Sequence, residues 1–422
     1  MEHTEETQQK QSSHKQLFLS IGVGAILVAV TILVILYGKG YRLGFQKGEP
    51  KVGKTGLIHV TSLPTGAQVY IDDHLTTATN NTINLTPGKY KVKIAKDGYN
   101  DWQKDIEIKE EVVSNADAIL FPKAPNLQSI STFGVESVVV DPSGTKLAFK
   151  IASQAARRNG VYVFDMTNRA FPVLAGQSSS TQLADDTVAL FSNAKITWSP
   201  DGKQILASIE TEGEDPSYYL LKTDGLNESP QDVTATLQSV QDMWKTQRRD
   251  KQTAQLKSLK PAVQKFSNKQ FRILSWSPDD TKILYQASES AQMPVFTKPR
   301  IIGNNLLYER RDLKKGAIYV YDTKEDVNTR LVDTIDELCS PMIPECTTPN
   351  PFTWLPDSTH LLYVHDKKIA IIEQDGSNMM TLYAGPFIDH YVFPWPDGSK
   401  IVILTNLSNP SVAPTLYTIG LK

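Results

Sequence analysis

Cysteine is nearly absent from this sequence of 422 residues, and its scarcity limits the possible metal and disulfide chemistry. The two cysteines, Cys339 and Cys346, lie in one short segment. A structural zinc site needs about four ligands, and no further cysteine or histidine flanks this pair. The spacing allows a small disulfide loop, which would place that part of the chain in an oxidising compartment. Two free thiols in a reducing compartment remain the alternative.

An excess of charge of one sign is also missing, and so are the motifs of the common enzyme families. Lysine and arginine total 44 against 46 aspartate and glutamate residues, so no basic excess attracts nucleic acid. The chain contains no Gly-x-Ser-x-Gly elbow, His-Glu-x-x-His pair or dinucleotide fingerprint. The seven histidines and the cysteine pair do not combine into a four-ligand zinc pattern. The sequence therefore predicts no catalytic residue, no metal site and no cofactor.

One long apolar run stands near the N-terminus. Leu17–Tyr37 holds 21 residues without a charge, bounded by Lys15 and Lys39. A helix of this length rises roughly 30 Å, about the hydrocarbon thickness of a bilayer. The run exceeds the usual signal-peptide core of roughly 7–15 residues, and no small-residue cleavage pattern follows it. We expect a retained transmembrane helix over 17–37, with a tail at 1–16 and a linker at 38–54.

Residues 55–122 alternate between short strand patterns and turn clusters. Lys89–Ile94 alternates charged and apolar residues with period two, which is typical of a strand with one wet face. The segment resembles the PEGA domain, a small β-sandwich-like module of bacterial and archaeal surface proteins. The matching motifs are Pro64-Thr-Gly-Ala67, Val69-Tyr-Ile-Asp72, Leu85-Thr-Pro-Gly88 with Tyr90 and Val92, and Gly98-Tyr99 with Trp102. Thr65 replaces the family's glutamate at a turn position that most residues tolerate.

The PEGA resemblance bears on the orientation of the chain. It implies no catalytic residues, and members of the family are often extracytoplasmic. Counted alone, the five basic residues at positions 39 to 54 would place the C-terminal body in the cytoplasm under the positive-inside rule. The resemblance, the close cysteine pair and the short N-terminal tail favour the opposite orientation. We therefore expect a single-pass cell-membrane protein with a cytoplasmic N-terminus and an extracytoplasmic body.

A strand–turn–strand pattern recurs five times after residue 135. The copies centre on Pro142, Pro200, Pro278, Pro356 and Pro396. In most copies a tryptophan precedes the proline and an aspartate follows it. In some copies a glycine comes directly after the aspartate. Proline presets φ for the turn, aspartate hydrogen-bonds its own backbone, and glycine accepts a positive φ. The tryptophans would be buried where one repeat packs on the next.

These blade-motif residues are predicted to be structural. They are Trp198, Pro200, Asp201, Gly202, Trp276, Pro278, Asp279, Trp354, Pro356, Asp357, Trp395, Pro396, Asp397 and Gly398. Further strand patterns follow the copies, as at Gly160–Asp165, so each repeat has about four strands, which is typical of a β-propeller blade. The motif resembles the Trp/Phe-Ser-Pro-Asp-Gly-Lys hairpin of TolB-like (WD-type) propellers.

The predicted fold is all-β apart from the anchor helix, with a PEGA-like domain at 55–122 and a β-propeller at 123–422. The motif prolines are 58, 78, 78 and 40 residues apart, and only the last spacing matches a bare blade of roughly 40 residues. Five blades are recognisable, and six or seven stay open. Leu127–Phe133 is expected to add a strand to the last blade and close the ring, because closure removes exposed strand edges.

Two insertions interrupt the repeats. In the first, at about 229–262, Ser229 is expected to cap a helix and Pro230 to take its first position. Helical spacing then relates Val233, Leu237, Val240 and Trp244. The basic stretch that follows has two interpretations. It contacts an anionic polymer or lipid headgroups, or it belongs to a solvated helical hairpin packed on the propeller. We favour the hairpin. No chemistry is predicted for the second insertion, at about Glu289–Lys315.

The absence of a catalytic set favours a binding or scaffold role. We expect an extracytoplasmic propeller that presents a surface to a protein, a peptide or a cell-wall glycan, with no nucleic acid and no cofactor. The PEGA-like module would be a spacer or contact the wall. The alternative is a propeller-fold hydrolase or lyase acting on surface glycan, using carboxylates around the channel. The motif aspartates occupy equivalent turns, so a turn role explains them.

Overall fold

The computed structural model of the protein describes residues 5–38, 41–46, 49–131, 133–167, 180–213, 215–333, 335, 338 and 350–422. Cys339 and Cys346 lie outside these residues, so the disulfide stays a prediction. Contacts between Cα atoms divide the chain into two units. The first contains Met1–Ala95, Trp102–Ile119 and Ile301–Leu307, and the second contains Lys96–Asp101, Leu120–Arg300 and Tyr308–Lys422.

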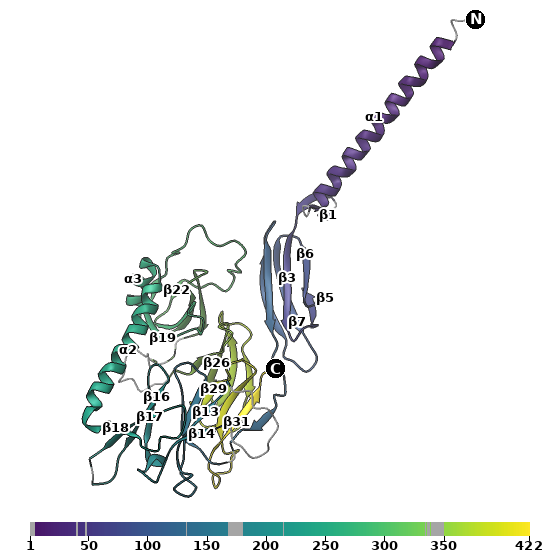
Figure 1. The fold of residues 1–422 in the computed structure, drawn as a ribbon. Coiled ribbons are helices and arrows are strands. Elements are labelled where there is room, and N and C mark those ends of the chain that lie inside the picture. Colours follow the sequence, from purple (N-terminus) through teal and green to yellow (C-terminus); the bar gives the residue numbers. More distant parts are fainter. Residues whose placement is uncertain are drawn as a thin grey trace. The chain divides into compact units, whose positions relative to one another are not determined.

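Helix α1 (Glu5–Gly38) contains the apolar run (Figure 1). Its most apolar window, Phe18–Ile35, spans 18 residues with a mean hydropathy of 2.8, and none of it is buried. Keeping such side chains in water costs about 25 cal/mol for each Å² of apolar surface. The helix is long and apolar enough to cross a membrane. The structure therefore contains a helix where the sequence predicts the membrane anchor.

Two sheets and a hairpin make up the described strands of the first unit. The hairpin pairs β1 (Tyr41–Gln46) with β2 (Glu49–Lys54). The three-stranded sheet has the order β6 (Asn81–Leu85), β3 (Gly56–Leu63) and β9 (Val113–Ile119). The four-stranded sheet has the order β5 (His74–Ala78), β4 (Gln68–Ile71), β7 (Gly88–Ala95) and β8 (Trp102–Ile108).

Alternation along these strands buries one face of each sheet. On β3, Ile58 and Val60 are fully buried, while their neighbours are partly exposed. On β7, Val92 and Ile94 are fully buried, and the adjacent Lys91 and Lys93 stay partly exposed. Because strand β3 contacts β8 of the other sheet, the two inner faces meet in one core. The sandwich-like module predicted for this segment is therefore present.

Among the described residues, the second unit contains five four-stranded antiparallel sheets, here called blades 1 to 5. Blade 1 consists of β11 (Glu136–Val140), β12 (Lys146–Ile151), β13 (Gly160–Asp165) and β14 (Ser180–Asp185). Blade 2 consists of β15 (Lys195–Trp198), β16 (Gln204–Ile209), β17 (Ser217–Lys222) and β18 (Gln231–Asp232). Blade 3 consists of β19 (Phe271–Trp276), β20 (Lys282–Ala287), β23 (Ile318–Asp322) and β24 (Val327–Val332).

The last two blades complete the propeller. Blade 4 consists of β25 (Phe352–Trp354), β26 (His360–His365), β27 (Lys368–Glu373) and β28 (Met380–Tyr383). Blade 5 consists of β29 (Val392–Pro394), β30 (Lys400–Thr405), β31 (Thr415–Gly420) and β10 (Leu127–Ser129). Outside the blades lie the 3₁₀ turn η1 (Phe191–Asn193) and the short pair β21 (Ala291–Gln292) and β22 (Asp312–Leu313). The five blades recognised in the sequence are all present in the described part of the chain.

Blade 5 joins the two ends of the propeller segment. Strand β10 precedes every other blade strand in the sequence, yet it pairs with β31, with Leu127 opposite Ile419. The Ile130 amide extends this pairing by donating to the carbonyl of Leu416 at 2.9 Å. The closing strand predicted from the sequence is therefore correct, and it covers an edge of β31 that would otherwise be open.

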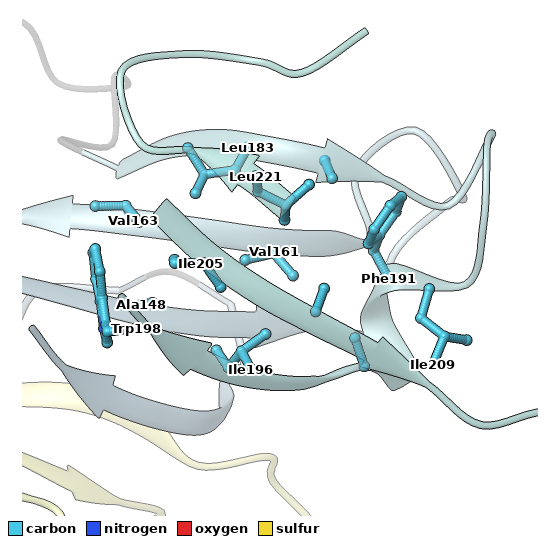
Figure 2. Close-up of a cluster of buried hydrophobic side chains, with 13 residues drawn as sticks. Ala148, Val161, Val163, Leu183, Phe191, Ile196, Trp198, Ile205, Ile209 and Leu221 are labelled. Carbon is cyan, nitrogen blue, oxygen red and sulfur yellow. The ribbon is translucent and has the colours of Figure 1, made fainter. Parts of the chain in front are cut away.

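Apolar side chains fill the contacts between neighbouring blades. Figure 2 shows the cluster between blades 1 and 2, where Val161 and Leu183 meet Trp198 and Ile205. Comparable clusters join blade 5 to blade 1 and blade 3 to blade 4. Strand alternation supplies both faces of a blade: on β16, Ile205 faces blade 1 and Leu206 faces the opposite side.

A helical insertion follows blade 2, but it begins later than predicted. The expected start at Ser229 and Pro230 is wrong, because Gln231–Asp232 form strand β18 and pair with β17. The chain then enters the 3₁₀ turn η2 (Thr234–Thr236), helix α2 (Leu237–Ser258) and helix α3 (Pro261–Gln270). Pairing with β17 satisfies backbone groups that a first helical turn would leave without partners, so the sheet prevails over the local capping signals.

The two helices cover the facing sides of blades 2 and 3. Val240 and Trp244 of α2 pack on Leu206 and Leu220 of blade 2. Further along, Leu259 and Val263 pack in a cluster of blade 3 side chains that includes Ile273 and Tyr285. In Figure 1 the helices run alongside the strands of these two blades. The insertion thus occupies an interface that blade-to-blade packing fills elsewhere in the propeller.

Candidate functional site

The motif aspartates close their own turns. They are Asp201, Asp279, Asp357 and Asp397. Asp201 is representative, since its carboxylate accepts hydrogen bonds from Ser199 Oγ at 2.6 Å and from the Lys203 amide at 3.1 Å. The other three carboxylates accept equivalent bonds from the residues of their turns.

These hydrogen bonds hold the pKa of each motif carboxyl below its usual value. For Asp201, the bond from Ser199 is the largest cause of the lowered pKa. For Asp279, burial acts to raise the pKa, but hydrogen bonds from two neighbouring hydroxyls and an amide outweigh it and hold the pKa at about 2. The pKa values of Asp357 and Asp397 are lowered against burial in the same way. The carboxyls are thus kept ionised.

The motif tryptophans occupy different environments. Trp198 packs between blades 1 and 2, and its Nε1 donates to the Val139 carbonyl at 3.1 Å. Trp354 packs between blades 3 and 4, where its Nε1 is buried without a hydrogen-bond partner in the described part of the chain. Trp276 is half-buried beside the helical insertion, and half-buried Trp395 meets Phe164 of blade 1 at a centroid distance of 5.7 Å.

A cavity of about 1280 Å³ lies at the end of the propeller that carries the motif turns. All five motif prolines line it: Pro142, Pro200, Pro278, Pro356 and Pro396. Because residues of every blade meet there, the cavity lies on the axis about which the blades are arranged. Its volume slightly exceeds the range of roughly 300–1,000 Å³ that is usual for small-molecule sites, so it has room for a segment of a polymer.

The structure brings only part of the predicted motif to this cavity. The lining residues of the predicted set are Trp198, Pro200, Asp201, Trp276, Pro278, Trp354, Pro356 and Pro396. The residues outside the lining are Gly202, Asp279, Asp357, Trp395, Asp397 and Gly398. Gly202 has a φ of +70°, and a Cβ there would come within 3.2 Å of Asp141 Oδ2, so the turns of blades 1 and 2 are closely packed. Some motif residues therefore line the cavity, and the others stabilise the turns behind this lining.

Helix α2 supplies a polar wall that the repeat pattern does not predict. Arg248, Lys251, Gln252 and Gln255 of this helix line the cavity. Gln255 Nε2 donates to Asp280 Oδ1 at 2.7 Å and so ties the helix to the turn of blade 3. The sequence marks Arg248 and Lys251 as members of a basic stretch. It gives no sign that they face the channel, because that depends on the helix lying between two blades.

Metal-ligating side chains do not cluster in the described residues: no group of three or more such side chains is close enough to hold an ion. Three carboxylates line the cavity, those of Asp141, Asp201 and Asp280. Asp141 is buried in its own turn, where it accepts hydrogen bonds from the amides of Thr145 and Lys146 at 2.7 Å. Asp141 and Asp201 therefore hold the turns that bear them, and Asp280 holds the contact between α2 and the turn of blade 3.

One protein family matches part of the chain. Residues 55–122 match the model of the PEGA domain, which confirms the resemblance drawn from the motifs of this segment. No curated protein matches the chain.

Several solved structures are similar to this chain at low identity. A protein described as TolB from Agrobacterium tumefaciens is 17% identical, with 67% of this chain and 77% of that chain covered and a TM-score of 0.22. TolB from Acinetobacter baumannii is 14% identical, with 79% and 60% covered and a TM-score of 0.23. The β-propeller domain of the Trilobed protease from Pyrococcus furiosus is 12% identical, with 87% and 95% covered and a TM-score of 0.20. The fold assignment rests on strand pairing, since TM-scores this low establish nothing further.

Proposed function

We propose that this protein is a membrane-anchored binding or scaffold protein whose propeller holds a protein, peptide or glycan ligand in the cavity at its turn end. The observation that carries the proposal is the convergence of all five blades and α2 on one cavity of about 1280 Å³. Ligand sites are typically concave and mostly apolar, with a few polar groups that orient the ligand. Prolines and tryptophans supply the apolar wall here, and α2 supplies the polar groups.

Helix α1 and the PEGA match support a location at the outer face of a cell membrane. The apolar run of 21 residues is longer than a signal-peptide core of roughly 7–15 residues, which supports a retained anchor. The N-terminal tail then lies in the cytoplasm, and the PEGA domain and the propeller lie outside. In this arrangement the PEGA domain is a spacer between the membrane and the propeller, or an element that contacts the cell wall.

Catalysis is not part of the proposal. A glycoside hydrolase needs a carboxyl whose pKa is raised so that it can act as general acid. Among the carboxyls that line the cavity, Asp201 has a lowered pKa because Ser199 donates a hydrogen bond to it. Asp141 and Asp280 accept hydrogen bonds from their surroundings. A glycan hydrolase or lyase remains the second candidate, supported only by the presence of these carboxylates at the cavity.

Binding assays with the full chain in uncharged detergent test the proposal. Arrays of peptides and of wall glycans are screened, and each ligand found is measured against Thr353→Trp. Thr353 is an exposed residue of the cavity wall, so the larger indole would project into the site, obstruct the ligand and abolish binding. Met243→Trp is the matched control, because Met243 is 48% exposed and lies outside the cavity lining. Unchanged binding by Thr353→Trp, or turnover of the ligands, would overturn the proposal.

A further inference from the structure

One face of helix α2 changes character along its length. Its first half is apolar: Leu237, Val240 and Trp244 pack on blade 2. Continuing the same stripe at steps of three and four residues leads to Arg248 and Lys251. Beyond them Leu256 and Leu259 are apolar again and pack toward blade 3. The polar interval coincides with the part of the helix that lines the cavity.

The two cations in this interval differ from the carboxylates around them. Arg248 and Lys251 are exposed, and within the described part of the chain neither side chain has a hydrogen bond or an ion pair. By contrast, Asp141 and Asp201 accept hydrogen bonds within their own turns, and Asp280 accepts one from Gln255. The carboxylates keep their charge, but each has a hydrogen-bond donor within the protein, so the charged groups at the cavity that have no described partner are the two cations on the α2 wall.

We propose that the cavity binds an acidic peptide segment, and that α2 determines this specificity through Arg248 and Lys251. This inference rests on the proposed function and names the ligand class of the same site. Carboxylates of the peptide pair with the guanidinium and ammonium groups, and charge-assisted hydrogen bonds of this kind are roughly twice as strong as neutral ones. The neighbouring amide of Gln252 both donates and accepts, which suits the alternating donors and acceptors of a peptide backbone.

The burial of the tryptophans at the cavity favours a peptide ligand over a glycan. Sugar rings stack on exposed aromatic faces, but Trp198 and Trp354 are enclosed between blades and have relative exposures of only 7% and 6%. Trp276 is half-buried and packs toward the helical insertion. The wall offers prolines instead, whose rigid rings lie well against an extended peptide. Recognition by charge and backbone contacts is then the mode that this surface supports.

Three labelled peptides test the inference. They have equal length and share one sequence, except that every second residue is Glu, Gln or Lys. Fluorescence anisotropy with the full chain in uncharged detergent measures their dissociation constants at low and high salt. The Glu peptide should bind about tenfold more tightly than the Gln peptide, a difference of about 1.4 kcal/mol. The Lys peptide should bind least, and added salt should weaken the Glu peptide most, because exposed ion pairs are screened.

Paired variants locate the effect on α2. Arg248→Gln with Lys251→Gln should bring the Glu peptide to the affinity of the Gln peptide. Arg249→Gln with Lys257→Gln removes the same charge from the same helix outside the cavity lining, and it should change the affinity less than about twofold. Equal binding of all three peptides, or an equal loss in both double variants, would overturn the inference.

The outcomes separate this inference from the proposed function. If the peptides bind without charge preference and Thr353→Trp still abolishes binding, the cavity is the site but α2 does not select acidic ligands. If only an acidic oligosaccharide binds and Thr353→Trp abolishes it, the peptide assignment is wrong and the proposed function stands. If neither peptides nor glycans bind, the inference is wrong, and so are the peptide and glycan ligands of the proposed function.

Discussion

A buried ion-pair network organises the second insertion around Arg311. Arg311 Nε lies 2.7 Å from Glu309 Oε1, and its Nη2 lies 3.0 Å from Asp326 Oδ1. Arg300 also binds Glu309 in a two-pronged pair, with Nη2 2.8 Å from Oε1 and Nη1 3.0 Å from Oε2. Asp326 also accepts the amides of Phe296 and Thr297 at 2.8 and 2.7 Å, so it ties the insertion to the end of blade 3. The network is structural and lies away from the cavity lining.

Removing the central cation should destabilise the protein strongly. Arg311→Ala leaves the Asp326 carboxylate, whose side chain is only 2% exposed, without its charge partner. Breaking a buried pair in this way costs about 3–5 kcal/mol. The matched control is Asp333→Ala, which breaks an ion pair to Arg330 at 3.4 Å in which Asp333 is 84% exposed, and should cost at most about 1 kcal/mol. Chemical denaturation of the full chain measures both, and equal small losses would contradict the structural role.

Asp279 should contribute stability that depends on pH. Its pKa in the folded protein is about 2, below the unfolded value of about 3.9. The ionised carboxylate therefore favours the folded state above about pH 4, and this contribution disappears as the pH falls through about 2. In Asp279→Asn, the deficit in unfolding free energy relative to wild type should shrink as the pH is lowered across that interval. A deficit that stays constant with pH would show that the turn hydrogen bonds do not favour the charged form.

Residue patterns predict the turns but not the ion pairs. Asp201 lies beside its partners Ser199 and Lys203 in the sequence, so a local motif is enough to recognise its role. Glu309 and Asp326 meet at Arg311 although they come from different segments, and no periodicity relates them. For the same reason, the sequence marks Arg300 and Arg311 as basic residues of an insertion and assigns them no role.

At the scale of elements, helix α2 shows how tertiary context changes a local prediction. The apolar spacing of Leu237, Val240 and Trp244 correctly predicts a helix that packs on the propeller. The start at Pro230 is wrong, since β18 extends blade 2 at that place. Nothing in the sequence indicates that the helix lies between two blades, because adjacent blades normally pack on each other directly. The polar wall of the cavity therefore becomes visible only in the structure.

Docking of α2 on blade 2 should depend on Trp244. Trp244 is 3% exposed in the cluster with Leu206 and Leu220. Trp244→Ala should lower the free energy of unfolding by about 3–5 kcal/mol, through lost burial and the cavity left behind. Met243→Ala, at the neighbouring exposed position, should change it by no more than about 0.5 kcal/mol. Denaturation curves compare the two, and similar values for both would show that α2 is not anchored through this face.

Closure of the propeller should depend on the strand that precedes blade 1. Ile130→Pro removes the amide that donates to the Leu416 carbonyl at 2.9 Å. The loss should cost about 1–3 kcal/mol, because a hydrogen-bonded carbonyl is left without its donor. Ile130→Val keeps the amide and most of the side chain, and should cost about 0.5–1.5 kcal/mol. Thermal unfolding and aggregation of the full chain report the difference. A proline variant as stable as the valine variant would mean that the closing strand is dispensable.

At the scale of the whole molecule, the sequence predicts the order of the parts well. The apolar run, the PEGA motifs and five hairpin repeats identify the helix, the sandwich-like unit and the propeller. The spacings of 78 residues before and after Pro278 signal inserted segments without showing where these pack. Long-range packing places the helices between blades 2 and 3 and brings one end of α2 to the cavity. The cavity wall is thus the part least accessible to sequence reasoning.

The central claim is that an open propeller cavity lies outside the membrane. Labelling of single cysteines in intact cells tests this claim, with spheroplasts used where an outer envelope blocks access. Both natural cysteines, Cys339 and Cys346, are first replaced by serine. Thr353→Cys then places a thiol on the cavity wall, and Ser12→Cys places one in the N-terminal tail. A membrane-impermeant maleimide should label position 353 without lysis and position 12 only after lysis. The reverse pattern would place the propeller in the cytoplasm and contradict the account.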